Sequence, residues 1–417
     1  FICVFLIYFI SVISPHVNFT MAYQGILHPE THYKPLFMLY ALFFFTPIFI
    51  LFKTIFKKSL QSSSLYEGYK NNLPTKKNLI TSIILPVLCI GSIFLVFKLS
   101  YNKTVKQSIA IHKYAEEEKW DKVIEIAAKL APDDRRVLFQ ANRALYHQGK
   151  LNDDAFSIIQ YWGKDGLLLT RHYNRKVLML ISDLSFDMGH IKESLHWAYE
   201  AQTIFDKSPE ILKRIIINNI IIGEYKAADK FLKILSCSII HKKWAEKYSK
   251  YLGDEELIKS NSVLNAKREL LPKKDFYAYT QKPENDLQNL FLAEPPNKMA
   301  FEYYILNALL KHDLAGIVVY FKYLEKLNYE RIPRHIEEGL LLFKTLNKDY
   351  KLDLGEFQIS EKSKKAFIDY TKIMTKHKQN MKAAQYELYR KYRNTFWYYI
   401  HYVSPITNKR EIQVKRL

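Results

Sequence analysis

The segment HPETH, at residues 28–32, carries side chains that could bind a metal. His28, Glu30 and His32 alternate along the chain, so an extended backbone would place two imidazoles and a carboxylate on one side. Imidazole and carboxylate groups together are a plausible zinc set. Pro29 holds His28 in an extended conformation, and the spacing is not that of the helical H-E-x-x-H motif. The simpler interpretation, an interfacial loop without a metal, is the one we adopt.

A second group of titratable side chains lies in RHIEEG, residues 334–339. Neighbouring acids on a helix face different directions, and acids are common in the first turn of a helix, which explains Glu337 and Glu338 without catalysis. The sequence contains no G-x-S-x-G, G-x-G-x-x-G or P-loop motif. We therefore expect no cofactor, and the missing motifs weigh against an enzyme.

The C-terminal tail is basic and aromatic. Residues 361–417 contain 14 Lys and Arg against four acids, which is half of the chain's net charge of +20. Its aromatic residues include Tyr386, Tyr389, Tyr392, Phe396, Trp397, Tyr398 and Tyr399. The favoured interpretation is a solvated helix face with a packed aromatic stripe. The alternative is a surface for anionic lipid head groups or an acidic partner.

Three apolar runs near the beginning predict membrane spans, at residues 1–13, 36–52 and 79–97. A helix needs about 20 apolar residues to cross the hydrocarbon core, and runs of roughly 17–25 suffice. The second and third runs meet that length. The first is shorter, and the chain begins at Phe1 rather than at a methionine, so we interpret it as the end of a truncated span.

The charge of the loops predicts the orientation of these spans. Residues 53–77 carry six lysines against one acid, Glu67, and the positive-inside rule places that loop in the cytoplasm. One further span then puts everything after about residue 100 on the periplasmic face of a bacterial inner membrane. The expected partners are membrane lipids and a protein, and no nucleic acid is expected on that face.

Beyond the third run, the spacing of apolar residues predicts amphipathic helices. Low Gly and Pro usage, 12 and 14 residues, disfavours a β-rich fold. One short phrase recurs around Trp120, Leu151, Ile191, Tyr225 and Leu314, at intervals of 31, 40, 34 and 89 residues. In each phrase a glycine or polar residue ends one helix and a large apolar residue begins the next. A helix pair of this kind buries its faces only by stacking on its neighbours.

These phrases resemble tetratricopeptide repeats, most clearly in GHIKESLHWAYEAQ and GEYKAADKFLKIL. The resemblance assigns turn glycines, large turn residues and small residues that allow close helix approach. The matching positions are Gly149, Leu151, Gly189, Ile191, Ser194, Ala201, Gly223, Tyr225 and Ala228. A generic α-solenoid is the alternative, because antiparallel helix pairs share much of this spacing.

Three further phrases resemble an uncharacterised family of multi-pass membrane proteins from Bacteroidetes. They are PPNKMAFEYYILNALL at 295–310, IPRHIEEGLLLF at 332–343 and YRNTFWYYIHY at 392–402. The resemblance implies a membrane-spanning N-terminal part and a helical-repeat C-terminal part, and it implies no activity.

The resulting prediction is an all-α chain in which transmembrane helices precede an α-solenoid. Its parts are a transmembrane region at 1–100, tetratricopeptide-like repeats at 101–271, a connection at 272–298 and a second helical block with the basic tail at 299–417. The expected function is a membrane-anchored scaffold that presents a periplasmic protein-interaction surface. The alternative is the C-terminal part of a polyprenol-sugar-dependent glycosyltransferase whose catalytic part precedes Phe1.

Overall fold

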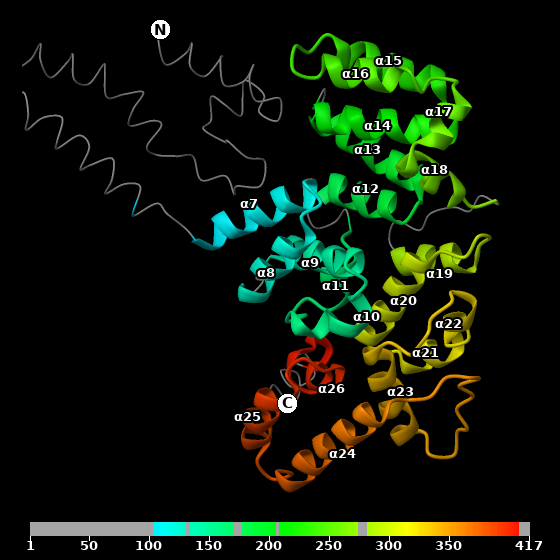
Figure 1. The fold of residues 1–417 in the computed structure, drawn as a ribbon. Helices are drawn as coiled ribbons and strands as arrows, with labels where there is room; N and C mark the ends of the chain where they lie inside the picture. The colour runs from blue at the N-terminus through cyan, green and yellow to red at the C-terminus, as the bar shows by residue number, and fades with distance from the viewer. Residues whose placement is uncertain are drawn as a thin grey trace, which may run out of the picture. The chain divides into compact units, whose positions relative to one another are not determined.

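The computed structural model describes residues 98, 103–130, 134–170, 177–205, 208–273 and 282–407. From Thr104 onward they form one compact unit. All regular elements of the described residues are helices, so the prediction of an all-α fold is confirmed for them (Figure 1).

The predicted location in a membrane is corrected. Among the helices that the structure describes, none is long and apolar enough to cross a bilayer. The longest, α24 (Glu361–Lys376), has 16 residues and carries charged side chains, whereas a span requires roughly 17–25 apolar ones. A multi-pass protein of the bacterial inner membrane is therefore not supported. The three runs behind that prediction, at 1–13, 36–52 and 79–97, lie outside the described residues.

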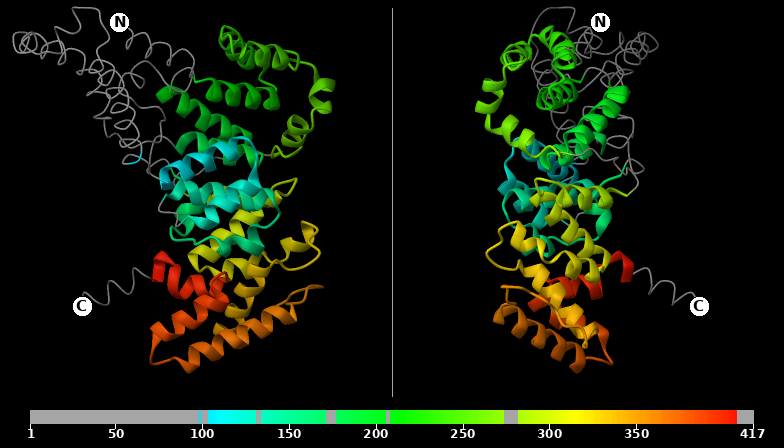
Figure 2. Two further views of the ribbon diagram at one scale, coloured as in Figure 1. Left: turned by 60° about the vertical axis from the view of Figure 1, so that its left-hand side comes forward. Right: turned by 90° about the vertical axis from the view of Figure 1, so that its right-hand side faces the viewer.

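The middle of the chain is a stack of helices in sequence order. Each helix packs against the next from α12 to α16, and α18 then packs back against α14 (Figure 2). The stack comprises α12 (Leu178–Asp187), α13 (Ile191–Phe205), α14 (Pro209–Ile222), α15 (Tyr225–Ser236), α16 (Lys242–Ser249), α17 (Glu255–Ser260) and α18 (Ser262–Glu269). Its apolar side chains form a core of their own.

The helices before and after this stack share a second core. The earlier set is α7 (Lys103–Glu116), α8 (Trp120–Lys129), α9 (Arg135–His147), α10 (Leu151–Asp154), η1 (Ala155–Ser157) and α11 (Lys164–Leu167). The later set is α19 (Pro283–Leu292), α20 (Lys298–Lys311), α21 (Leu314–Tyr320), α22 (Tyr323–Lys326), α23 (Arg334–Leu346), α24, α25 (Met381–Tyr392), α26 (Phe396–Tyr398) and the π-helix η3 (Tyr399–Val403). Their buried residues make one continuous cluster.

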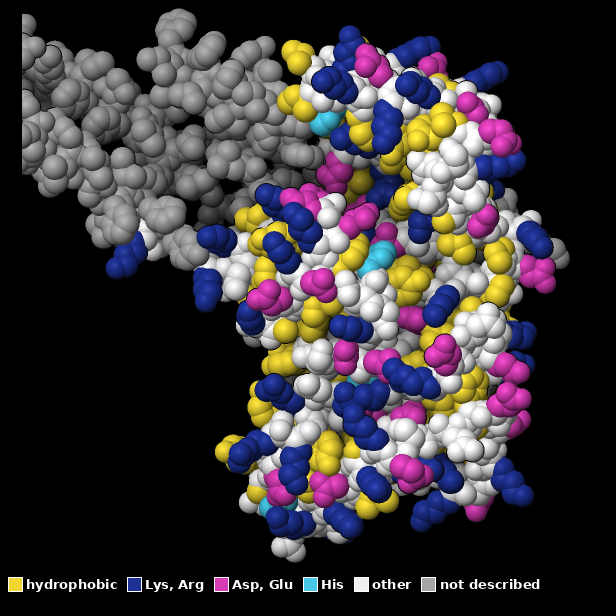
Figure 3. All heavy atoms as spheres, viewed as in Figure 1, with side chains coloured by type: hydrophobic (Ala, Val, Ile, Leu, Met, Phe, Trp, Pro, Cys, Tyr) yellow, Lys and Arg dark blue, Asp and Glu magenta, His cyan; other side chains and the backbone are white. Residues whose placement is uncertain are grey.

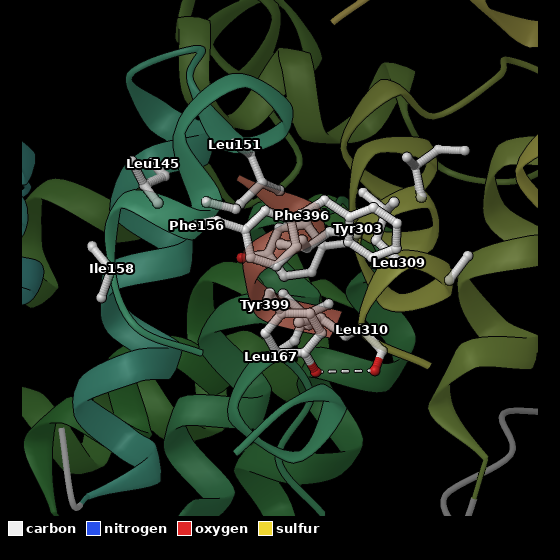
Figure 4. Packing of buried hydrophobic residues seen from close by; sticks show 14 of the residues in the cluster. Leu145, Leu151, Phe156, Ile158, Leu167, Tyr303, Leu309, Leu310, Phe396 and Tyr399 are labelled. Carbon is white, nitrogen blue, oxygen red and sulfur yellow. Dashed lines mark hydrogen bonds between the residues drawn. The ribbon is translucent and has the colours of Figure 1, made fainter. Parts of the chain in front are cut away.

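Aromatic packing joins these distant segments. The Phe156 ring lies 5.1 Å from the Tyr399 ring and 5.7 Å from the Phe396 ring. The Tyr399 hydroxyl donates a hydrogen bond to the carbonyl of Leu310 at 3.1 Å (Figure 4). This cluster brings η1, the end of α20 and the α26–η3 segment to one place.

The five helix starts of the recurring phrase share one turn. Trp120, Leu151, Ile191, Tyr225 and Leu314 are each the first residue of a helix. Two positions earlier the backbone has a positive φ of 55° to 85° in the set Glu118, Gly149, Gly189, Gly223 and His312. The N–H of the next residue bonds to the carbonyl five positions back, at 2.8 Å in all five turns. This is the Schellman helix end, and it reverses the chain into an antiparallel helix pair.

A buried ion network connects the stack with the neighbouring core. Arg143 of α9 donates to the Asp187 carboxylate of α12 at 2.7 and 2.9 Å, and Asp183 of α12 accepts from Arg214 of α14 at 2.7 Å. Burial alone would raise the pKa of Asp187, but Arg143 and His147 lower it far below its usual value. The carboxylate is therefore held in its charged form.

Candidate functional site

A surface cleft of about 1010 Å³ lies between α10, α23, α24, α25 and the turn that leads to α26. Its basic lining residues are Arg331, Arg334, Lys362, Arg390, Lys391 and Arg393. Its acidic lining residues are Asp153, Asp154, Glu337 and Glu338. Figure 3 shows Lys and Arg side chains gathered over α23 and α26 in the lower half of the face, with acidic side chains among them.

One wall of the cleft is built by Asp153 at the end of α10. Its carboxylate accepts two hydrogen bonds from Arg331, at 2.8 and 3.1 Å, and one from the Arg334 N–H at 2.7 Å. The last bond satisfies a free N–H at the start of α23, where Pro333 is the N-cap. Burial would raise the pKa of Asp153, but the bonds from Arg331 and from the Arg334 N–H lower it below its usual value.

Glu338 forms the floor. It is 2% exposed and accepts from Arg334 Nε at 2.9 Å and from the Phe396 N–H at 2.7 Å. His335 Nδ1 lies 2.9 Å from the same carboxylate, and His335 Nε2 lies 3.5 Å from the Phe156 N–H. Because a carboxylate accepts, His335 donates to Glu338 through Nδ1.

Glu337 fixes the opposite wall, at the start of α24. Its carboxylate accepts from the Ser360 N–H and hydroxyl, each at 2.7 Å, and from the Ser363 hydroxyl at 2.5 Å. Ser360 is the N-cap of α24 and accepts from the Ser363 N–H. Glu337 and Glu338 are adjacent in sequence, yet each bonds a different distant segment.

The rim is formed by the exposed face of α25. Tyr389 and Arg390 point to solvent there, and Arg393 follows one turn later. The Arg393 guanidinium lies 5.6 Å from the centre of the Tyr389 ring, and the Tyr389 and Tyr398 rings meet edge to face at 6.0 Å. The Arg393 guanidinium and the Tyr389 ring therefore form a cation–π contact beside the cleft.

The cleft is lined by fixed carboxylates and by exposed cations. The carboxylates of Asp153, Glu337 and Glu338 each accept several hydrogen bonds, so they hold the walls in place. The exposed lining residues include Lys362, Tyr389, Arg390 and Arg393, and Asp154 is partly exposed beside them. Among the described residues, no group of His, Cys, Asp and Glu is arranged to hold a metal ion.

The residues predicted as sites lie elsewhere. His28, Glu30 and His32 are outside the described residues. Leu151, with no exposed surface, lies in the core that α10 shares with α20, while the other described signature side chains lie in or beside the stack. Ser194 is fully buried and bonds Ser182 and Asn218, and the glycines form the Schellman turns described above.

The repeat-signature side chains in the stack are brought together as two neighbouring helix pairs. Ile191, Ala201 and Ala228 are fully buried in one core, where small side chains allow the helices to approach. Tyr225 lies at the edge, and its hydroxyl bonds Arg268 at 2.9 Å. The repeat assignment itself stays a prediction.

The cleft residues were not predicted as a site from the sequence. Two signals nevertheless pointed to them, the acidic pair in RHIEEG and the cations with aromatics in the tail. The segments of the cleft are joined by bonds between residues far apart in the sequence, such as Asp153 with Arg331, 178 residues later, and Glu338 with Phe396. No local pattern marks these pairs. Two of the three phrases of the family resemblance, those at 332–343 and 392–402, contribute lining residues to the cleft.

Comparison with known proteins gives a family and nothing more specific. Residues 1–403 match the model described as a family of unknown function (DUF6057). The match agrees with the predicted uncharacterised family and carries no information on organism, membrane spans or repeats. No curated protein matches the chain, and no solved structure matches it.

Proposed function

The chain belongs to the DUF6057 family, whose function is unknown, and we propose that it is a helical-repeat protein that binds a protein partner. In this proposal residues 101–271 are tetratricopeptide-like repeats of an α-solenoid, residues 272–298 are a connection, and residues 299–417 are a second helical block that forms the binding cleft together with α10. Stacked helix pairs commonly serve as extended binding surfaces.

The observation that carries the proposal is the exposed face of α25. Tyr386 is 70% exposed and Tyr389 is 44% exposed, on the same helix face as Arg390. Tyrosine and arginine are the residue types that dominate the energetics of protein interfaces. They stand on α25, which packs against α24 and α26. The Glu337 and Glu338 networks fix the starts of those two helices, so little ordering would be needed on binding.

The stack α12–α16 supports the same proposal. It repeats one turn geometry, and Ile239 in its turn between α15 and α16 is 97% exposed. The carboxylates of Asp153, Glu337 and Glu338 are bonded to internal donors, so these three are poorly placed to act as a general base.

The test is affinity purification of the full-length chain from native cells in mild detergent, with identification of companion proteins. We expect a reproducible companion that is lost with the double substitution Arg390→Glu and Arg393→Glu. The matched control is Lys243→Glu with Lys250→Glu, which makes the same change of charge on and just after α16. A companion retained by the cleft variant, or a chain purified alone, would contradict the proposal.

A further inference from the structure

The charges that line the cleft are unequally engaged. The carboxylates of Asp153, Glu337 and Glu338 accept hydrogen bonds from within the chain. Arg331 is paired with Asp153 and Arg334 with Glu338, and Lys391 lies 3.6 Å from Asp369. Lining charges with no ion-pair partner among the described residues are Lys362, Arg390, Arg393 and Asp154. The free charge of the cleft is therefore positive, with three cations against one acid.

The free cations sit on more than one wall. Lys362 lies in the first turn of α24, while Arg390 and Arg393 come from α25 and the residue that ends it. All three side chains are exposed. A ligand in the cleft would therefore meet cations from two helices, with the Tyr389 ring as an apolar surface beside Arg393.

We infer that the cleft binds an acidic stretch of a protein chain, with Arg390 and Arg393 pairing with its carboxylates and Tyr389 packing against it. The inference rests on the proposed function and names the partner chemistry. Guanidinium forks match carboxylates in a bidentate geometry. The volume of about 1010 Å³ lies at the upper end of the range for small-molecule sites, roughly 300–1,000 Å³, which favours a peptide.

The charge balance favours an acidic peptide over a nucleic acid. A nucleic-acid groove follows the phosphate backbone with many cations and stacks successive bases on several rings. Here the excess of cations is small, and four acids lie in the same lining. Two tyrosines of α25 line the cleft, and the hydroxyl of one of them, Tyr392, donates to Asp369 at 2.7 Å. A short run of Asp or Glu residues needs no more than this.

The experiment uses the purified full-length chain and a fluorescein-labelled glutamate-rich peptide, with binding followed by fluorescence anisotropy. We expect Arg390→Glu with Arg393→Glu to weaken binding about tenfold or more, because like charges then face the peptide. The control pair Lys243→Glu and Lys250→Glu changes the net charge equally and should leave affinity unchanged. A glutamine-rich peptide of the same length should not bind.

A charge swap separates recognition from a loss of structure. The Arg390→Glu and Arg393→Glu variant should gain affinity for a lysine-rich peptide that the natural chain does not bind. The inference is overturned if both charge-reversal variants bind the acidic peptide equally weakly, or if the natural chain also binds the glutamine-rich peptide. It is also overturned if the chain binds a single-stranded oligonucleotide but not the acidic peptide. If a companion is captured through the cleft but the acidic peptide does not bind, the inference fails and the proposed function stands.

Discussion

Glu338 shows how much one buried side chain can organise. Its carboxylate accepts from α23, through Arg334 and His335, and from the Phe396 N–H, 58 residues away. The Trp397 indole N–H also donates to the Glu338 carbonyl, at 2.9 Å. Replacing the carboxylate leaves several buried donors without an acceptor, which is the costly outcome for a polar network.

We predict that Glu338→Ala lowers the free energy of unfolding by about 3–5 kcal/mol, the usual effect of removing one partner of a buried charged pair. Urea unfolding followed by circular dichroism measures the change. Glu325→Ala is the control: Glu325 is an exposed acid of α22, and its loss should change stability by less than about 0.5 kcal/mol. If both variants change the free energy of unfolding by a similarly small amount, the Glu338 network does not stabilise the fold.

His190 makes the stability depend on pH. It lines a small apolar cavity with Leu168 and Trp197, and burial lowers its pKa from 6.5 to about 4. Unfolded chains therefore take up a proton below about pH 6.5, whereas the folded chain resists it until about pH 4. The unfolded state binds more protons in this window, so the free energy of unfolding falls as the pH falls.

We predict that this contribution reaches roughly 1–3 kcal/mol between neutral pH and about pH 4. Substituting His190→Gln removes the titrating group, so stability should fall less steeply over that window. Urea unfolding of both chains at a series of pH values gives the two slopes. Parallel slopes would mean that His190 remains accessible to protons in the folded chain.

At the scale of elements, the recurring Schellman turn explains why the repeat phrase could be found at all. A positive φ favours glycine, and three of the five turns have one, at Gly149, Gly189 and Gly223. The other two use Glu118 and His312 in the same conformation, so a search for glycine alone misses them. Their apolar helix starts, Trp120 and Leu314, still marked the phrase.

Two of these glycines differ in their surroundings. A Cβ on Gly223 would meet nothing within 4 Å, whereas one on Gly189 would lie 2.7 Å from the Cβ of Leu270. We predict that Gly223→Ala costs about 1–2 kcal/mol, the price of the left-handed conformation alone. Gly189→Ala should cost about 1–3 kcal/mol more, because Leu270 and its backbone must also move.

Thermal unfolding of the two variants side by side makes this comparison, and each is the control for the other. Equal losses would mean that Leu270 yields freely and that the turn conformation is the whole effect. A larger loss for Gly223→Ala would contradict the arrangement of α18 against the α12–α13 turn.

The same elements show what a single sequence cannot predict. The recurring phrase predicts helices that begin at Ile191 and Tyr225, and α13 and α15 begin there. Local periodicity fixes such helices, because their hydrogen bonds and apolar faces depend on near neighbours. The pairing of Asp153 with Arg331 depends on tertiary packing across 178 residues, and the acids of RHIEEG carried no local sign that they would be buried.

At the scale of the whole described unit, its first and last helices form one core, and the helices between them form the stack. Helices α7–α11 and α19–η3 share a core that is interrupted in sequence by α12–α18. The aromatic tail closes it, because Phe396, Trp397 and Tyr399 are at most 2% exposed. The basic aromatic tail thus divides into a buried closing segment and the exposed face of α25.

This division predicts the effect of ending the chain after Asn394. Removing Phe396, Trp397 and Tyr399 opens the core around Phe156, at a cost that exceeds the roughly 3–5 kcal/mol of one buried aromatic. Hydrogen exchange followed by mass spectrometry should show loss of protection in α9 and α20, far away in sequence. Protection in α13–α15 should persist, because these helices pack in the other core.

A chain that ends after Thr407 is the matched control, because it keeps every residue of the shared core. It should retain the protection of the natural chain in both cores. Uniform loss of protection in the shorter chain would mean that the stack unfolds together with the core that flanks it, so that the two behave as one cooperative unit. Unchanged protection in α9 would instead mean that the helices α7–α11 stay folded without α26 and η3. The shared core would then not depend on the buried aromatic residues of the tail.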